Sequence, residues 1–398
     1  MTAHRPERGG LHEIAWVFLK LGTIGFGGPA AHIALMEDEV VRRRGWLARE
    51  EFLDLLAATN MIPGPNSTEM AIHVGLRRGG APGLLIAGFC FILPAALIVT
   101  GMAWSYVRYG SYPVAESALF AIKPVVAVIV IHAVWSFGRT AIRSRGLAML
   151  AAAALLATVL GAHELVVIGA AGVLAALAPG TDPKDRAAGL AALPPPGAAM
   201  PASTAGGWST IALAAAAAPA AAAVPVTLSG LFLAFLKIGS VLFGSGYVLL
   251  AFLRGDLVER FHWLTESQLL DAVAVGQFTP GPLSTTATFI GYLLAGLPGA
   301  GVATLGMFLP SFVFVAISGP LVPRLRRSPV AGRVLDGLVA GSLAVMAAVA
   351  FVLARSAVLD WRTALLAVIA GGLLFRLRVS SVWLVLGAGI VGALAGFL

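Results

Sequence analysis

The chain has 398 residues, of which 59% are hydrophobic and only 12% are charged, and its mean hydropathy is +0.91. A soluble domain carries about a quarter charged residues, so this composition excludes a soluble protein and predicts an all-α polytopic membrane protein. The net charge of +8 comes from 27 basic residues scattered through short loops. That scatter favours the positive-inside bias of membrane proteins over nucleic-acid binding.

Apolar segments of spanning length follow one another in two sets of six. The first set covers 11–36, 52–76, 84–107, 114–138, 147–160 and 163–178. The second set covers 226–253, 268–295, 297–319, 330–355, 361–376 and 379–398. We therefore predict repeats at 1–178 and 226–398, joined by a Pro- and Ala-rich linker at 179–225. The Ala-rich part of the linker is either an extra span or low-complexity sequence.

One stretch near the start of each set occurs twice. Phe18-Leu19-Lys20-Leu21-Gly22 recurs as Phe235-Leu236-Lys237-Ile238-Gly239, and Pro63-Gly64-Pro65 recurs as Pro280-Gly281-Pro282. Both recurrences have an offset of 217 residues, and about a third of the positions are identical over the 51 residues from Phe18 onward. Coincidence between two apolar segments does not explain this agreement, so the halves are homologous.

The distribution of arginines indicates that the two halves have opposite orientations. In the first half arginines follow the first, second and fourth segments, whereas in the second half they follow the third and fifth. If the first two segments are re-entrant or broken, all basic loops of the first half share the cytoplasmic face with the N-terminus. We therefore expect an inverted-topology repeat with one extra crossing between the halves, for which the Ala-rich run is the candidate.

Both repeated motifs break helices. The glycine clusters remove side chains where the backbone bends, and Pro63 and Pro65 lack the N–H group that a helix needs. We predict that a helix stops near Asn60 and restarts at Asn66-Ser67-Thr68, which are good N-cap residues. N–H groups freed at such breaks attract anions. The alternatives are close helix packing for the glycines and a mere kink for the prolines.

The candidate substrate-binding residues lie at or beside these breaks. They are Lys20, Gly25, Gly27, Gly28, Asn60, Gly64, Asn66, Ser67, Thr68, Lys237, Gly244, Ser245, Gly246, Gln277, Thr279, Gly281, Ser284 and Thr285. The two lysines match across the repeat. They either reach toward the membrane interface or neutralise an anion.

Two further side chains are candidates for proton coupling. Glu69 and His73 follow the first break at helical spacing i, i+4, and the second half has Thr286 and Ile290 in their places. An ionisable residue inside a membrane segment is by default a candidate for a proton relay.

Other charges in the apolar segments have less specific interpretations. Asp54 and Asp271 match across the repeat and lie near segment ends, where they cap helices or pair with arginines. Glu116 and Lys123 are one helix face apart and form a candidate pair, although their spacing does not establish it.

No sign of enzyme chemistry accompanies these residues. The sequence lacks a G-x-x-x-x-G-K-[ST] loop, its histidines are isolated and its carboxylates are not clustered. Cys90 is the single cysteine, so neither a disulfide framework nor a thiolate metal site is available. We expect no catalytic residues, no metal site and no cofactor.

The motifs also carry a family resemblance. They are Phe18–Gly22, Gly25–Pro29, Arg44–Leu47, Glu51-Phe52 and Asn60–Asn66 in the first half, and Phe243–Gly246, Trp263–Thr265 and Gln277–Pro282 in the second. This pattern closely resembles the chromate transporter family in its long, two-domain form. The resemblance implies a multi-pass secondary transporter of the inner membrane that exports chromate, gives chromate resistance and is driven by protons, as in an antiporter.

The second half departs from the first at two points. Ser245 and Gly246 stand where the first half has Gly28 and Pro29, and Leu283 replaces Asn66. We therefore expect the two halves to contribute unequally to one site.

Other functions remain open beside chromate export. The expected partners are chromate or sulfate, protons and the lipid bilayer, and a homodimer is compatible with the sequence. A sulfate or other oxyanion permease or channel is the first alternative. A lipid-phosphate flippase or membrane enzyme is the second, although an enzyme would need a nucleophile or metal set that the sequence does not show.

Overall fold

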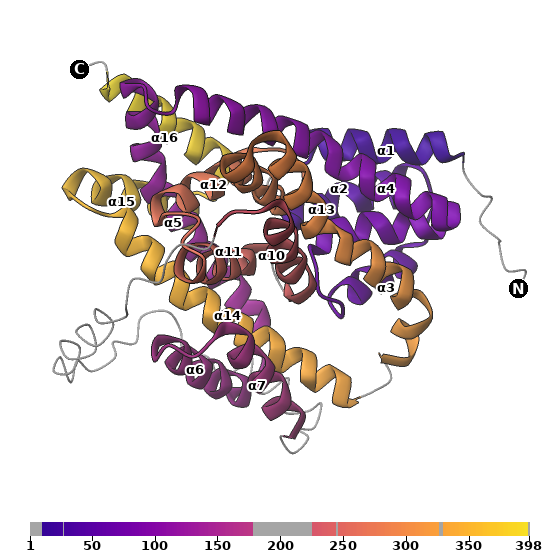
Figure 1. Cartoon of the computed structure of the whole chain (residues 1–398). Helices are drawn as coiled ribbons and strands as arrows, with labels where there is room; N and C mark the ends of the chain where they lie inside the picture. The colour runs from indigo at the N-terminus through magenta and orange to yellow at the C-terminus, as the bar shows by residue number, and fades with distance from the viewer. Residues whose placement is uncertain (1–9, 27, 178–224, 244–245, 326–328, 397–398) are drawn as a thin grey trace, which may run out of the picture.

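The computed structural model describes residues 10–26, 28–177, 225–243, 246–325 and 329–396, which are helical and contain no β-strand. The first half contains α1 (Leu11–Ile24), α2 (Pro29–Glu37), η1 (Asp38–Arg43), α3 (Arg49–Thr59), α4 (Asn66–Tyr109), α5 (Pro113–Ala141), α6 (Arg145–Val159) and α7 (Glu164–Leu177). The second half contains α10 (Leu228–Val241), η3 (Gly246–Val248), α11 (Leu249–Leu253), η4 (Arg254–Arg260), α12 (Glu266–Phe278), η5 (Leu283–Thr285), α13 (Thr286–Leu325), α14 (Pro329–Ala357), α15 (Trp361–Phe375) and α16 (Ser381–Ala395). The predicted all-α membrane protein with two related halves is confirmed (Figure 1).

The two halves contain corresponding elements in the same order. A short helix, α1 or α10, is followed by a break, a second short helix and a π-helix, which is η1 in the first half and η4 in the second. The predicted segments 11–36 and 226–253 are therefore broken helices, which is one of the two possibilities, re-entrant or broken, that the sequence left open. α1 and α10 have 14 residues each, about 21 Å of helix, whereas the hydrocarbon core is about 30 Å thick.

Both long helices after the Pro-Gly-Pro tripeptides fold back on themselves. α4 has left-handed backbone angles at Gly80, with φ 65°, and α13 has them at Gly296, with φ 62°. A methyl group added at Gly291 would lie 2.6 Å from the Cβ of Ala303. Twelve residues of straight helix would separate these positions by about 18 Å. α13 therefore consists of two arms that meet at Gly296, and α4 has the same design with arms 66–79 and 81–109, because a methyl group added at Gly75 would overlap the Ala87 Cβ.

Four helices are long and apolar enough to cross a membrane among the described residues, over 66–109, 113–141, 283–318 and 330–357. By contrast α6, α7, α15 and α16 have only 14 or 15 residues each. None of these four helices spans about 30 Å of hydrocarbon alone. They occur as two consecutive pairs, α6–α7 and α15–α16, which contact each other within the pair.

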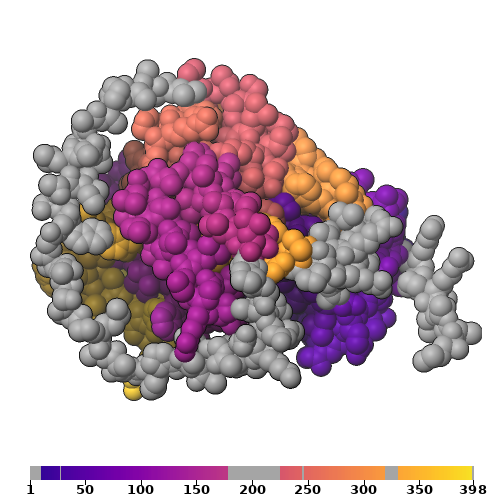
Figure 2. All heavy atoms as spheres, turned by 90° about the horizontal axis from the view of Figure 1, so that it is seen from below, coloured from indigo at the N-terminus to yellow at the C-terminus, as the bar shows by residue number. Residues whose placement is uncertain are grey.

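These helix pairs are exchanged between the halves. The α6–α7 pair packs on α14, and the α15–α16 pair packs on α5, so each pair covers the long helix of the other half (Figure 1). In Figure 2 the magenta segment that includes α6 and α7 stands over orange and yellow segments of the second half. One cluster of buried apolar side chains includes Val126, Leu250 and Val345 and so draws on both halves. The halves therefore interlock.

The domain boundaries predicted from the sequence remain a prediction. The linker at 179–225 and its Ala-rich run lie outside the described residues, apart from Pro225.

Candidate functional site

The first break separates α1 from α2. α1 ends at Ile24, Gly25 caps it through a hydrogen bond from its N–H to the Leu21 carbonyl, and α2 begins at Pro29. Proline suits the first position of a helix because its missing N–H has no partner there in any case. Gly28, just before it, has φ 80°, a conformation that favours glycine.

The second break is the Pro-Gly-Pro loop between α3 and α4. α3 ends at Thr59, Asn60 caps it, and α4 begins at Asn66, so the predicted stop and restart are confirmed. The Asn66 side-chain amide donates to the Asn60 side-chain oxygen at 2.8 Å and closes the loop. Gly64 has φ 144° and its counterpart Gly281 has φ 89°, which explains a glycine between the two prolines.

The breaks of the two halves meet through a reciprocal pair of hydrogen bonds. The Gly64 N–H donates to the Leu242 carbonyl at 2.7 Å, and the Gly281 N–H donates to the Gly25 carbonyl at 2.7 Å. Gly64 and Gly281 differ by 217 residues, as do Gly25 and Leu242. The two hydrogen bonds therefore occupy equivalent positions in the two halves. We call this region, made of the described residues 25–26, 28–29, 63–65, 242–243, 246 and 280–282, the crossover.

Close packing at the crossover leaves no room for side chains at Gly64 and Gly281. A Cβ atom added at Gly281 would lie 2.7 Å from the Ala95 Cβ, and one added at Gly64 would overlap the Glu69 carboxyl and lie 2.7 Å from the Ser311 Oγ. A Cβ atom added at Gly246 would lie 3.6 Å from the Pro29 Cγ of the opposite half, which is ordinary van der Waals contact. Gly64 and Gly281 thus permit both close packing and sharp turns, so helix packing and backbone bending both account for a glycine at these positions.

Several polar groups beside the crossover are buried without hydrogen bonds among the described residues. They are the Thr68 hydroxyl, both carboxyl oxygens of Glu69, the Gln277 Nε2 and the Ser311 hydroxyl. Thr68, Glu69 and Ser311 are fully buried, and Gln277 is 7% exposed. An unsatisfied buried polar group costs about 1–3 kcal/mol, so this concentration indicates a place where a polar ligand or water binds. Glu69 and Ser311 both adjoin Gly64, and the Gln277 Oε1 accepts from the Tyr247 hydroxyl at 3.3 Å.

His32 lies beside the crossover and was not predicted from the sequence. Its Nε2 lies 2.9 Å from the Gly25 carbonyl, which also accepts the Gly281 N–H. Because a carbonyl only accepts, Nε2 carries the hydrogen in this contact. The histidine is 2% exposed and its ring packs edge-on against Phe91. The available signal was a lone polar residue in the apolar run from Pro29 to Met36.

The two matched lysines are ion-paired. The Lys20 Nζ lies 2.9 Å from the Glu39 Oε2, and the Lys237 Nζ lies 2.7 Å from the Asp256 Oδ1. Glu39 and Asp256 also differ by 217 residues, so the whole pair is repeated. From the sequence, the membrane interface and an anion were the expected destinations of the lysines. These carboxylates were not predicted, although they recur at the same offset as the lysines.

Other predicted residues have different surroundings. The hydroxyls of Thr279 and Thr285 donate to the backbone carbonyls of Val275 and Pro282 in their own turns, so in this conformation they satisfy the chain itself. Ser67 and Ser284 are buried, whereas Asn60 is exposed. Gly27, Gly244 and Ser245 lie outside the described residues.

Lys123 and Asp271 do not follow the pairings suggested by sequence. Lys123 lies 3.6 Å from Asp271 and donates to the Ser267 hydroxyl at 2.7 Å, so the structure gives it partners other than Glu116. The Tyr106 hydroxyl donates to Asp271 at 2.9 Å. Asp271 is therefore a buried partner of a lysine and a tyrosine, and the expected arginine partner is wrong for it.

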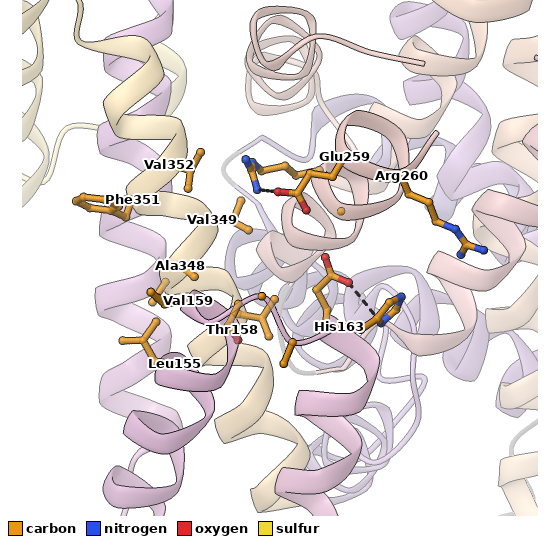
Figure 3. Close-up of a pocket in the computed structure, with 17 residues that line it drawn as sticks. Leu155, Thr158, Val159, His163, Glu259, Arg260, Ala348, Val349, Phe351 and Val352 are labelled. Carbon is orange, nitrogen blue, oxygen red and sulfur yellow. Dashed lines mark hydrogen bonds and ion pairs between the residues drawn. The ribbon is translucent and has the colours of Figure 1, made fainter. Parts of the chain in front are cut away.

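A separate cavity lies between the α6–α7 pair, η4 and α14. Its volume is about 860 Å³, and its lining includes His163, Arg254 and Arg260. Figure 3 shows Glu259 of η4 opposite Val349 and Val352 of α14, whereas the Arg260 side chain points away from α14. The residues that line this cavity do not include those of the crossover.

Four broken helices that cross inside an apolar bundle, with buried polar groups at the crossing, define a membrane transporter by class. The family model described as chromate transporter matches residues 12–176 and 229–393. The chain belongs to the chromate transporter family. Both matches together cover most of the chain and repeat the same unit in each half.

Individual relatives agree with this assignment. The chain is similar to a protein named chromate transport protein from Cupriavidus metallidurans, at 32% identity over 99% of this chain and 95% of that protein. It is also similar to a chromate transport protein from Pseudomonas aeruginosa, at 30% identity over 94% of this chain and 90% of that protein. A shorter Bacillus subtilis relative, named uncharacterized transporter YwrA, is 36% identical over 32% of this chain and 72% of its own length. No solved structure matches the chain.

Proposed function

We propose that this chain exports chromate from the cytoplasm across the inner membrane, coupled to protons, and so gives chromate resistance. The observation that carries the proposal is the crossover, where reciprocal hydrogen bonds join the breaks of both halves beside buried polar groups without partners. The names of the full-length relatives support chromate as the substrate. One chain already contains both halves, so the proposal does not require the homodimer that the sequence allows.

The chemistry of the crossover suits a tetrahedral oxyanion. Chromate and sulfate are dianions with four acceptor oxygens, and they need hydrogen-bond donors and positive potential at membrane depth. α4 begins at the crossover, and η5 leads into α13 there. The first N–H groups of a helix have no partner within it, and its N-terminus carries a partial positive charge. The Thr68 hydroxyl and the Gln277 amide add side-chain donors.

Glu69 is the residue that we assign to proton coupling. Its carboxyl is fully buried and unpaired among the described residues, and burial of an unpaired carboxylate costs several kcal/mol. The neutral acid therefore suits this conformation, and contact with water on one face would release the proton. A carboxylate and a dianion repel each other, so the charge state of Glu69 affects anion binding. His73, one turn later and also buried, is the second candidate.

The inverted orientation of the halves belongs to the same proposal. The arginine distribution supports it, and so does the reciprocal bonding at the crossover, which a two-fold relation between the halves explains. A topology reporter fused near Arg326 should report the cytoplasm. An extracellular signal from this fusion would contradict the inverted arrangement.

Flux in everted vesicles tests the proposed function, because export then appears as chromate uptake. An imposed pH gradient with an acidic interior should accelerate uptake if protons and chromate exchange as in an antiporter. Acceleration by an acidic exterior would instead show co-transport, and no response to either gradient would contradict proton coupling. Sulfate uptake that chromate does not inhibit would favour the sulfate permease.

A further inference from the structure

We propose that Lys20 and Lys237 are exchangeable anion ligands, each of which leaves its carboxylate for the passing oxyanion while an arginine keeps that carboxylate neutralised. This inference rests on the proposed function. It assigns a role to the repeated ion pairs that the crossover itself does not explain.

The first observation is the repetition of the pair relative to the crossover. Lys20 stands five residues before Gly25, and Lys237 stands five residues before Leu242. Gly25 and Leu242 supply the two carbonyls that accept the crossover hydrogen bonds. Five residues of helix rise about 7.5 Å, so each lysine lies within about two turns of the crossover on its own helix.

The second observation is a second cation at each carboxylate. Lys20 binds Oε2 of Glu39, while the Arg44 Nε binds Oε1 at 2.9 Å. In the other half the Arg260 Nη1 lies 4.0 Å from the Asp256 carboxylate that holds Lys237. Departure of either lysine therefore leaves a carboxylate that still has a positive neighbour, which avoids the cost of a buried unpaired charge.

The balance of contacts at Glu39 agrees with a charged carboxylate while Lys20 is bound to it. Burial raises the pKa of Glu39, but the hydrogen bonds from Lys20 and Arg44 lower it by more, so that the pKa lies below its ordinary value. An anion that binds Lys20 therefore competes with the negatively charged Glu39 carboxylate.

The third observation is the difference in exposure within each pair. The side chains of Lys20 and Lys237 are 36% and 28% exposed, whereas those of Glu39 and Asp256 are 8% and 5% exposed. The carboxylates are fixed in the π-helices η1 and η4, a rare geometry that occurs frequently at functional sites. The partly exposed lysine is thus the member of each pair that is able to move.

The surroundings of the second pair supply room for an anion. Arg260 lines the cavity of about 860 Å³ (Figure 3), and its Nη1 lies 4.0 Å from the Asp256 Oδ1. An anion that entered this cavity would meet Arg260 next to the Lys237–Asp256 pair. The described residues include both members of each repeated pair, so the same experiment applies twice.

Chromate flux in vesicles distinguishes lysine exchange from a purely structural ion pair, because the two predict different directions of change in the KM for chromate. Lys20→Gln should raise the KM for chromate about tenfold, the effect of losing one charged hydrogen bond. Glu39→Gln should lower the KM, because it removes the competitor of the anion while the amide keeps the side-chain volume. A structural ion pair predicts that both substitutions impair transport in the same direction.

Matched variants guard against misfolding. Lys237→Gln and Asp256→Asn repeat the test in the other half, and Arg43→Gln removes the exposed Asp38–Arg43 pair of the same π-helix as a control. Insertion and the melting midpoint of each purified variant are measured alongside flux. KM shifts in the same direction for the lysine variant and the carboxylate variant of a pair, or no shift in either variant, would overturn the exchange alone. Wild-type vesicles that carry neither chromate nor sulfate would overturn the proposed function itself.

Discussion

At the scale of single residues, the asymmetry between the halves is concentrated in a few polar side chains. His32 is matched by Leu249 and Glu69 by Thr286 at the offset of the repeat. The backbone bonds of the crossover, by contrast, are present in both halves. The repeated backbone thus supplies a symmetric frame, and the titratable groups inside it come from the first half.

Replacement of Glu69 tests its assignment to proton coupling. Glu69→Gln keeps the shape and neutral charge of the buried acid but holds no proton to exchange. We expect chromate flux to continue while its response to an imposed pH gradient disappears. Glu50→Gln, at an exposed position, is the control and should respond as the wild type does. A Glu69→Gln protein with an unchanged response would remove Glu69 from the mechanism.

Replacement of His32 tests whether its hydrogen bond to the Gly25 carbonyl stabilises the protein. His32→Ala deletes one buried hydrogen bond and one ring contact, so we expect a loss of about 1–3 kcal/mol of stability. The measurement is the melting midpoint of the purified protein in detergent. His12→Ala, at an exposed position, should leave the midpoint unchanged, and equal midpoints for the two variants would contradict the structural role of His32.

At the scale of elements, helix boundaries were more predictable than helix partners. The stop at Asn60 and the restart at Asn66 follow from proline's missing N–H, which is a local property of the chain. The exchange of the α6–α7 and α15–α16 pairs was not predicted, because helices of similar apolar composition give no local sign of which long helix they cover. The ion pairs were predicted only in part. The recurrence of Lys20 in the second half was recognised from the sequence, whereas the recurrence of the Glu39 carboxylate at the same offset was not.

A substitution at the second Pro-Gly-Pro loop tests the crossover as an element. In Gly281→Val the added side chain meets the Ala95 Cβ, and φ 89° is unfavourable for valine. We expect chromate transport to be abolished while the protein still inserts in the membrane. Gly301→Val is the matched control, since no atom lies within 4 Å of a Cβ there. Normal chromate resistance in the Gly281→Val strain would refute the crossover as the site.

At the scale of the whole molecule, the exchanged helix pairs make the halves dependent on each other. α5 is covered by α15 and α16, and α14 is covered by α6 and α7. A half produced alone would expose these apolar faces of α5 or α14 to lipid instead of protein. Two sequence repeats therefore build a single packed body among the described residues.

Splitting the chain between Met200 and Pro201 tests this dependence. The two fragments should restore chromate transport when produced together, because each supplies the helix pair that the other lacks. Neither fragment alone should accumulate as a stable protein, as measured by membrane protein levels. A split within α5, between Val126 and Ala127, is the control that we expect to abolish transport even with both fragments present. Transport by one fragment alone would contradict the interlocked fold.

The exchange of helix pairs also bears on leakage, which any transporter in an energised membrane must limit. α5 and α14 contact each other, and each is also held by a helix pair that the opposite half supplies. If one half tilts to admit water from one face, its helix pair moves with it and displaces the long helix of the other half on which that pair is packed. We therefore expect the two faces to open in turn, since a water path through both at once would require both sets of contacts to separate together.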